Sequence, residues 1–460
     1  MAVTRAAHID MAKVDELIAD EERALEPKHP KSIAFREVAN EHVAGGVASS
    51  WQDAPPHVVY VTEGKGSKIW DLDGNEYVDY HNGYGVMVVG HAHPKIVKAV
   101  QERVPKGTHF AQPGPEIVPV AENLVERFKL PLWRFGNSGT EATLDAVRLM
   151  RAASGRDLLI KIEGTYHGHH DSLMVSVMPE ADLIGPREHP NSVPQTLGLP
   201  QQFADLVRVV PYNDLDALER TLTENEDRVA GMFIEPAMMN AGIIPPEPGY
   251  LEGVREITKR HGVYLAFDEV KTGCAVAWGG AVQRWGVTPD IVCLAKVIGG
   301  GLPCGAIGAT EELMARVISG EMDLQGTFNG NPLTMAASLT TLTEVLTPDA
   351  YDHLEHLNTI LADGINAAID RYALPAYVLT FGAKGSVIYS PTRVRDYRDH
   401  LEVDERLSYL AWLVQQNRGV FKSPWAKTET WTIGVQHSDA DAQLYVDNFT
   451  EFASMLASAS

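Results

Sequence analysis

The chain has 460 residues, a length that predicts one large domain with smaller lobes rather than a single small core. Apolar residues make up 45% of the sequence and charged residues 22%, as is ordinary for a globular protein. With 39 Lys plus Arg against 61 Asp plus Glu, the formal net charge of -22 argues against a nucleic-acid partner or an anionic membrane surface.

Three cysteines, Cys274, Cys293 and Cys304, occur without a CxxC pair, which disfavours a zinc site and suits a reducing compartment. No run of about 18 uncharged apolar residues is present, so no membrane span is expected. The acidic N-terminal stretch has no apolar core typical of a signal peptide and is not a transit peptide. We therefore expect a cytoplasmic protein.

The first predicted elements are an N-terminal helix and a strand pair. Helical spacing of apolar residues predicts a helix over 11–25. The segment "SKIWDLDGNEYVDY" (67–80) alternates in polarity and predicts two strands around the turn Asp73–Gly74.

From about residue 100 to 310, short apolar segments alternate with helical patterns, such as the crossover helix over 248–262. The predicted strands are 133–137, 158–164, 207–212, 230–236, 263–270, 290–297 and 304–310. Because these strands are apolar on both faces, they predict a parallel-rich sheet covered by helices on both sides. Ligands of such sheets bind at the carboxyl ends of the strands.

After about residue 345 the pattern changes to long helices and alternating strands, such as "ETWTIGVQ" (429–436). This change predicts a separate α+β lobe that is joined to the N-terminal strands. The expected organisation is an N-terminal part of the small domain over 1–75, a large domain over 76–344 and a C-terminal small domain over 345–460.

The first strand end, "GNSGTEA" (136–142), leads into a helix. Free N–H groups at the helix start and the hydroxyls of Ser138 and Thr140 suit a phosphate group. An ordinary helix cap is the alternative interpretation.

The next strand end, "EGTYHGHHD" (163–171), places Tyr166 and His167 between glycines. The aromatic face suits a planar ligand, and a loop aromatic that packs on its own domain is the alternative. The three histidines His167, His169 and His170 have no matching carboxylate or Cys set, so no metal is expected.

Two further strand ends carry opposite charges. "FDEVKTG" (267–273) places Asp268 and Glu269 at the end of a buried strand, where a carboxylate needs a positive partner. Lys296 ends an apolar strand 28 residues later, and burial favours its neutral, nucleophilic amine. A solvated lysine at the strand end is the alternative if Lys296 is considered alone.

A phosphate cradle, an aromatic face, a buried carboxylate and a buried lysine together indicate pyridoxal phosphate. Lys296 would form the Schiff base with its aldehyde, and Asp268 would hold the proton of its ring nitrogen. Strand alternation sends Glu269 to the other face, where Lys271 or a helix N-terminus is its candidate partner.

The motifs "NSGTEA", "YHGH", "FDEVKTG", "LAKVIGGGLPCGAIG" and "GTFNGNP" occur in this order. From about residue 35 to the C-terminus, the chain resembles class III pyridoxal-phosphate aminotransferases of fold type I. The subgroup it resembles is glutamate-1-semialdehyde aminomutase and its relatives. The resemblance implies an α/β large domain with a mostly parallel seven-stranded sheet, and a smaller α+β domain built from both termini.

The resemblance also implies roles for individual residues. Lys296 and Asp268 match the catalytic Schiff-base lysine, which also moves the substrate proton, and the partner of the ring nitrogen. The positions that match the family's other cofactor contacts are Ser138, Gly139, Thr140, Tyr166, His167, Glu235, Asn240 and Thr327. Because Thr327 matches the threonine that reaches the neighbouring subunit's phosphate, a homodimer with shared active sites is implied.

The substrate residues depart from the aminomutase pattern. Gln52 in "GGVASSWQ" stands where the aminomutases carry an arginine for the substrate carboxylate. Cys274 and Ala275 replace the aromatic residue and the arginine of many class III transaminases. The residues expected at the substrate are Trp51, Gln52, Tyr84 and Trp425, while Lys427 is a candidate carboxylate ligand or a solvated loop lysine.

The Pro- and Gly-rich loop 178–200 falls where the aminomutase subgroup has a gating loop, and we expect a lid rather than a surface insertion.

The favoured function is a ping-pong transaminase that moves an amino group between an amine or β-amino acid with an aromatic or apolar substituent and a keto acid. The alternative is glutamate-1-semialdehyde 2,1-aminomutase. A decarboxylase or racemase on the same fold stays open, whereas a DNA-binding regulator is disfavoured by the negative charge.

Overall fold

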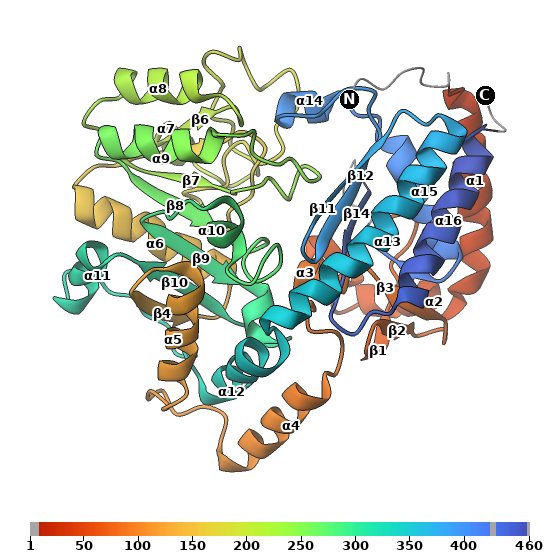
Figure 1. Cartoon of the computed structure of the whole chain (residues 1–460), viewed down its shortest axis with the longest axis horizontal. Helices are drawn as coiled ribbons and strands as arrows, with labels where there is room; N and C mark the ends of the chain where they lie inside the picture. Colours follow the sequence, from red (N-terminus) through yellow and green to blue (C-terminus); the bar gives the residue numbers. More distant parts are fainter. Residues whose placement is uncertain (1–8, 424–428, 458–460) are drawn as a thin grey trace. The chain divides into compact units, whose positions relative to one another are not determined.

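A computed structural model describes residues 9–423 and 429–457, which form two compact units (Figure 1). Unit 1 contains the described residues of Met1–His93, Asp352–Arg393 and Val403–Ser460. Unit 2 contains Pro94–Tyr351 and Val394–Glu402. Among the described residues, no helix combines the length and the apolar character that crossing a membrane requires.

Unit 2 is built on a seven-stranded sheet of order β4-β10-β9-β8-β7-β5-β6. Its strands are β4 (Leu132–Gly136), β5 (Leu158–Ile162), β6 (Val207–Val210), β7 (Val229–Ile234), β8 (Tyr264–Asp268), β9 (Ile291–Ala295) and β10 (Gly305–Ala309). Strands β6, β5, β7, β8 and β9 pair in parallel, and β10 runs antiparallel to both of its neighbours. The mostly parallel seven-stranded sheet predicted from the sequence is confirmed.

Helices pack on this sheet, among them α6 and α9 (Figure 1). The helices of unit 2 are α4 (Pro94–Arg103), α5 (Ile117–Phe128), α6 (Gly139–Ser154), α7 (Gln201–Asp205), α8 (Leu215–Glu224), α9 (Tyr250–Arg260), α10 (Gly280–Trp285), α11 (Glu311–Ile318), α12 (Pro332–Thr340) and α14 (Tyr397–Leu401). Helix α6 buries the face of Ala142, Ala146 and Met150 against apolar strand residues such as Phe233 and Ile291. This packing fixes the start of α6 beside the carboxyl ends of the strands.

Strand β5 contains a charged residue that its apolar pattern does not predict. Lys161 is fully buried, and its Nζ donates hydrogen bonds to the carbonyl oxygens of Thr165 (2.8 Å) and Val175 (2.5 Å). Burial lowers the pKa of Lys161 to about 7. Because the two carbonyls belong to the segment that follows β5, the Lys161 side chain holds this segment onto the sheet.

Unit 1 contains two small sheets. Strands β1 (Val61–Lys65), β2 (Lys68–Asp71), β3 (Glu76–Asp79) and β13 (Val420–Phe421) form one, and β11 (Tyr377–Phe381), β12 (Lys384–Ile388) and β14 (Glu429–Thr432) form the other. Strand β13 pairs in parallel with β3, so the C-terminal part of the chain extends a sheet of the N-terminal part. The predicted α+β domain built from both termini is confirmed.

Helices of the two chain ends also pack together in unit 1. The helices lying wholly or mostly in this unit are α1 (Met11–Leu25), α2 (Pro30–Asn40), α3 (Asn82–Gly85), α13 (Pro348–Tyr372), α15 (Glu405–Asn417) and α16 (Asp439–Ala457). Asp10 caps α1 by accepting from the backbone N–H of Ala12. Leu25 of α1 packs with Trp412 and Leu413 of α15, as expected for an amphipathic helix.

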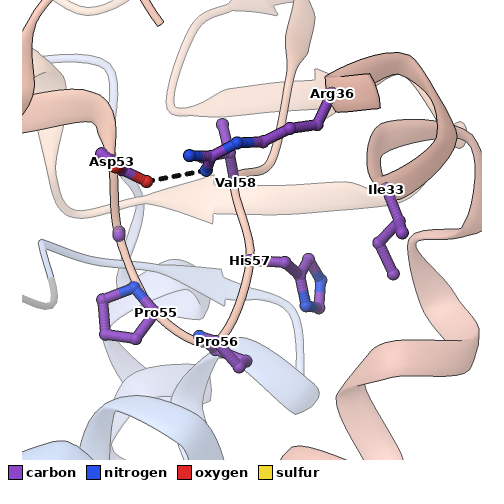
Figure 2. A pocket seen from close by; sticks show the side chains of 8 residues that line it. Ile33, Arg36, Asp53, Pro55, Pro56, His57 and Val58 are labelled. Atoms are coloured by element: carbon purple, nitrogen blue, oxygen red, sulfur yellow. Dashed lines mark hydrogen bonds and ion pairs between the residues drawn. The ribbon is translucent and has the colours of Figure 1, made fainter. Parts of the chain in front are cut away.

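A hollow of about 520 Å³ lies beside the segment that follows Trp51 and Gln52 in unit 1 (Figure 2). Figure 2 shows Arg36 reaching toward Asp53, with which it forms an ion pair of 2.7 Å. On the same segment, His57 Nε2 lies 2.8 Å from Nδ1 of the buried His29. These contacts fix the segment on both sides of its prolines.

Candidate cofactor site

The start of helix α6 has the geometry expected of an anion cradle. Ser138 is its N-cap, and the hydroxyl accepts from Glu141 N at 3.2 Å. A Cβ at Gly139 would lie 2.8 Å from Val270 Cγ2, so the packed Val270 side chain leaves no space for a side chain at this position. The Thr140 hydroxyl accepts from His169 N at 3.0 Å. Helix starts of this kind present free N–H groups and a positive dipole end to a phosphate.

The loop after β5 carries Tyr166 and His167 to the end of β8. His167 is buried, and its Nδ1 lies 2.8 Å from Asp268 Oδ2. Its other ring nitrogen, Nε2, is buried without a hydrogen-bond partner among the described residues. Thr143 of α6 donates to the His167 carbonyl at 2.6 Å. The His167 ring is thus held in place and oriented toward the Asp268 carboxylate.

The two acidic residues at the end of β8 contact different partners. Asp268 is only 5% exposed and accepts from Val270 N at 3.0 Å in addition to its contact with His167. Glu269 is fully buried on the other side, where it accepts from the Thr272 hydroxyl (2.9 Å) and from Ala281 N (2.7 Å) at the start of α10. Of the two partners considered for Glu269, the helix N-terminus is therefore the one it contacts.

Lys296 follows β9 at the edge of the sheet where Asp268 ends β8, and it begins the short 3-10 helix η5 (Lys296–Gly299). Its backbone adopts a left-handed conformation with φ +51, which is costly for a residue with a long side chain. Burial lowers the pKa of the Lys296 amine, against the opposing effect of Asp268 and Glu235. A strained, desolvated lysine whose pKa is influenced by two carboxylates is typical of a functional amine.

Glu235 follows β7, and its side chain connects the loop that carries Tyr166 with the turn that contains Met239 and Asn240. Its carboxylate accepts from Tyr166 N (3.0 Å), Met239 N (2.7 Å) and Asn240 Nδ2 (2.8 Å). The predicted residues Tyr166, Glu235 and Asn240 are therefore brought together in unit 2. The negative charge of Glu235 also acts on the Lys296 amine, where it favours a higher pKa against the effect of burial.

Thr327 lies elsewhere on unit 2. It is exposed and lines an open hollow of about 650 Å³. Phe110, Val118 and Asn329 also line this hollow. No described contact joins Thr327 to the residues around Lys296, so its role as a phosphate contact across subunits stays a prediction.

The predicted substrate residues belong to unit 1. Trp51 and Tyr84 pack edge to face with ring centroids 5.9 Å apart, and the Tyr84 hydroxyl donates to the Trp51 carbonyl. Gln52 is exposed, and its Oε1 accepts from Ala48 N at 3.0 Å. Trp425 and Lys427 lie outside the described residues, and the substrate roles of all these residues stay predictions.

Sequence reasoning missed several charged residues around the site. Lys161 lies inside a strand that is otherwise apolar, and the sequence indicates Lys271 only as a candidate partner of Glu269. Arg398 donates to both carboxylate oxygens of the buried Glu163 (2.8 and 3.0 Å), which directly precedes the loop of Tyr166. A buried carboxylate at a strand end signals that a cation is required, but the sequence does not show which one.

The residues of unit 2 fit pyridoxal phosphate chemically. The start of α6 can hold the phosphate, the His167–Asp268 pair can hold a protonated ring nitrogen, and Lys296 supplies an amine for the aldehyde. Among the described residues, no group of three or more His, Cys, Asp and Glu side chains is arranged to hold a metal ion. The fold and this donor set define a pyridoxal-phosphate site of fold type I.

Comparison with known proteins agrees with this assignment. The sequence model "Aminotransferase class-III" matches residues 49–401. Glutamate-1-semialdehyde 2,1-aminomutase 2 from Brevibacillus brevis is 37% identical over 91% of this chain and 96% of its own length. The chain therefore belongs to the class III aminotransferase family. The predicted cofactor, pyridoxal phosphate, is confirmed.

Two solved structures are similar along nearly the whole chain. An omega-transaminase from Sphaerobacter thermophilus has a TM-score of 0.87 and 32% identity, and the match covers 93% of this chain and 98% of that one. A lysine-to-alanine variant of a glutamate-1-semialdehyde-aminomutase from Pseudomonas aeruginosa PAO1, solved in complex with PMP, has a TM-score of 0.89 and 29% identity, with coverage of 97% and 99%.

Proposed function

We propose that this protein catalyses amino-group transfer with pyridoxal phosphate held by Lys296. The observation that carries the proposal is the cluster of unit 2 in which Glu235 contacts the Tyr166 loop and Asn240, and His167 contacts Asp268. The charges of Asp268 and Glu235 also act on the buried Lys296 amine. Bound pyridoxal phosphate supplies an electron sink for carbanion chemistry at the substrate carbon that carries nitrogen.

The chain's own residues have separate tasks in this proposal. Lys296 holds the cofactor and moves the substrate proton, for which a lowered pKa is needed near neutral pH. Asp268 keeps the ring nitrogen protonated, and His167 orients the Asp268 carboxylate through its Nδ1 contact. Ser138, Gly139 and Thr140 hold the phosphate at the start of α6.

The aminomutase reaction is the candidate substrate chemistry that the relatives support best. A protein named glutamate-1-semialdehyde 2,1-aminomutase 2 is 37% identical over 91% of this chain, and one from Aquifex aeolicus is 38% identical over 83%. On this basis, the substrate is a short semialdehyde acid whose amino group moves to a neighbouring carbon.

Gln52 favours a second candidate, a transaminase for an amine or β-amino acid with an aromatic or apolar group. The position expected to carry a carboxylate-binding arginine has a neutral amide that is engaged with Ala48 N. Loss of a bidentate guanidinium would weaken binding of a carboxylate substrate. The similarity to the omega-transaminase structure agrees with this candidate.

The discriminating experiment mixes the cofactor-loaded protein with single amines and amino acids, without an acceptor, and follows the absorbance of the bound cofactor. Rapid bleaching by an aromatic amine or β-amino acid supports the transaminase. No response to these compounds, together with turnover of 4,5-diaminovalerate or the semialdehyde, supports the aminomutase. Lys296→Ala is the control, and we expect it to abolish turnover while circular dichroism stays unchanged. Turnover by this variant would refute the proposed function.

We further propose a homodimer in which Thr327 contributes to the partner's site. Support comes from the open apolar hollow that Thr327 lines in unit 2, beside Phe110 and Val118, which are 53% and 56% exposed. Exposed apolar patches of this kind mark protein–protein contacts.

A further inference from the structure

Lys271 is a second lysine near Lys296 that the proposed chemistry does not use. It follows Asp268 by three residues, at the end of β8. Its side chain is partly buried, and its Nζ donates to the Met239 carbonyl at 3.0 Å. This contact directs the ammonium group toward the turn that follows Glu235.

The turn after Glu235 is held from two sides. The Glu235 carboxylate accepts from Met239 N (2.7 Å) and from Asn240 Nδ2 (2.8 Å), while Lys271 donates to the carbonyl of the same Met239. Glu235 in turn accepts from Tyr166 N. The position of the Lys271 amine is therefore tied to two predicted cofactor contacts, Tyr166 and Asn240.

The charges that face Lys271 come from three elements. Lys296 of η5 disfavours the protonated Lys271 amine, whereas Glu235 after β7 and Asp268 of β8 favour it. Burial is the largest effect and, with Lys296, lowers the pKa of Lys271 to about 7. The Lys271 amine is therefore protonated below about pH 7. The same two carboxylates thus favour the protonated form of both amines.

We propose that Lys271 is a positioning residue of the cofactor site, which holds the Met239–Asn240 turn against Glu235 and places a positive charge near Lys296. This inference rests on the cofactor site proposed at Lys296. The charge makes protonation of the Lys296 nitrogen less favourable, so that Lys296 is available as a base near neutral pH.

The test compares holoenzymes of Lys271→Met, Lys271→Gln and Lys271→Arg by a pH titration of the absorbance of the bound cofactor. Methionine removes both the donor and the charge, glutamine keeps a hydrogen-bond donor without the charge, and arginine keeps both. We expect the titration midpoint to rise by about 1 pH unit in the Met and Gln variants, because a nearby positive charge is lost. The Arg variant should titrate close to the wild type.

The exposed Lys259 of α9 provides a matched control, and Lys259→Met should leave the midpoint unchanged. A wild-type midpoint in Lys271→Gln would overturn the inference, because the hydrogen bond alone would then account for Lys271. If the wild type itself holds no absorbing cofactor, the proposed function fails instead. The absorbance titration thus separates failure of the inference about Lys271 from failure of the proposed function, and it does not depend on turnover.

Discussion

Buried ionisable residues at the strand ends of unit 2 differ in the groups with which they form hydrogen bonds. Asp268 faces the His167 ring, Lys161 donates to carbonyl oxygens, and Glu269 accepts from the first turn of α10. The sequence could predict that Asp268 and Glu269 need partners, since unpaired buried carboxylates are costly. It could not choose between Lys271 and a helix start for Glu269, because strand alternation gives the face and not the neighbouring element.

Glu269 provides a prediction about pH and stability. Burial raises the pKa of its carboxyl from 4.5 to about 7, although three donors face it. Because the pKa is higher in the folded chain, the stabilising contribution is complete below about pH 4.5 and is lost as the pH rises through about 7. Relative to Glu269→Gln, the free energy of unfolding of the wild type should fall by up to about 3 kcal/mol between about pH 4.5 and about pH 7.

Urea unfolding of both proteins at about pH 5 and about pH 8 measures this difference. Glu252→Gln, at an exposed position of α9, is the matched control and should follow the wild type at both pH values. Equal pH dependence of the wild type and Glu269→Gln would show that the Glu269 carboxyl does not titrate in this range.

At the scale of elements, the strands were predictable and one long-range contact was not. The strands of unit 2 are short and largely apolar, and most of them end at a polar or glycine residue, so local composition locates them. Helix α14 instead joins β5 through Arg398 and Glu163, residues 235 positions apart. No local periodicity encodes such a pair.

Helix α14 also contacts the loop predicted to be a lid. Arg398 Nη1 donates to Gly185 O at 3.0 Å, and the Tyr397 hydroxyl donates to Pro179 O at 3.0 Å. The residues on both sides of Val394–Glu402 belong to unit 1, whereas this segment belongs to unit 2. Its contacts fix one end of the loop 178–200, whose role as a lid stays a prediction.

Arg398→Met should therefore destabilise the protein and release this loop. The change leaves the buried Glu163 carboxylate without its bidentate cation, which costs about 3–5 kcal/mol for buried pairs. We expect a lower Tm and faster hydrogen exchange over 178–187, measured by mass spectrometry. Arg260→Met is the control, since the pair of Arg260 with Glu219 is exposed and worth at most about 1 kcal/mol. Unchanged exchange over 178–187 would mean that α14 does not hold the loop.

At the scale of the whole molecule, the described chain leaves an apolar surface without a partner. Phe110, Val118 and Phe328 are 53%, 56% and 57% exposed in unit 2. The rings of Phe328 and His109 lie 4.5 Å apart, and His109 lines the same hollow as Phe110 and Thr327. A second copy of the chain is the occupant that the proposed role of Thr327 requires.

Phe110→Glu combined with Phe328→Glu should weaken the proposed dimer. Each change puts a carboxylate where the dimer would bury apolar surface, and an unpaired buried charge is costly. We expect the dissociation constant to rise at least about tenfold, which corresponds to about 1.4 kcal/mol. Light scattering after size exclusion, over a range of protein concentrations, measures this rise. Ile318→Glu changes another exposed apolar residue, on α11, and should leave the mass at two chains. A wild type that has the mass of one chain at all concentrations would contradict the dimer, and the assignment of Thr327 would then fail with it.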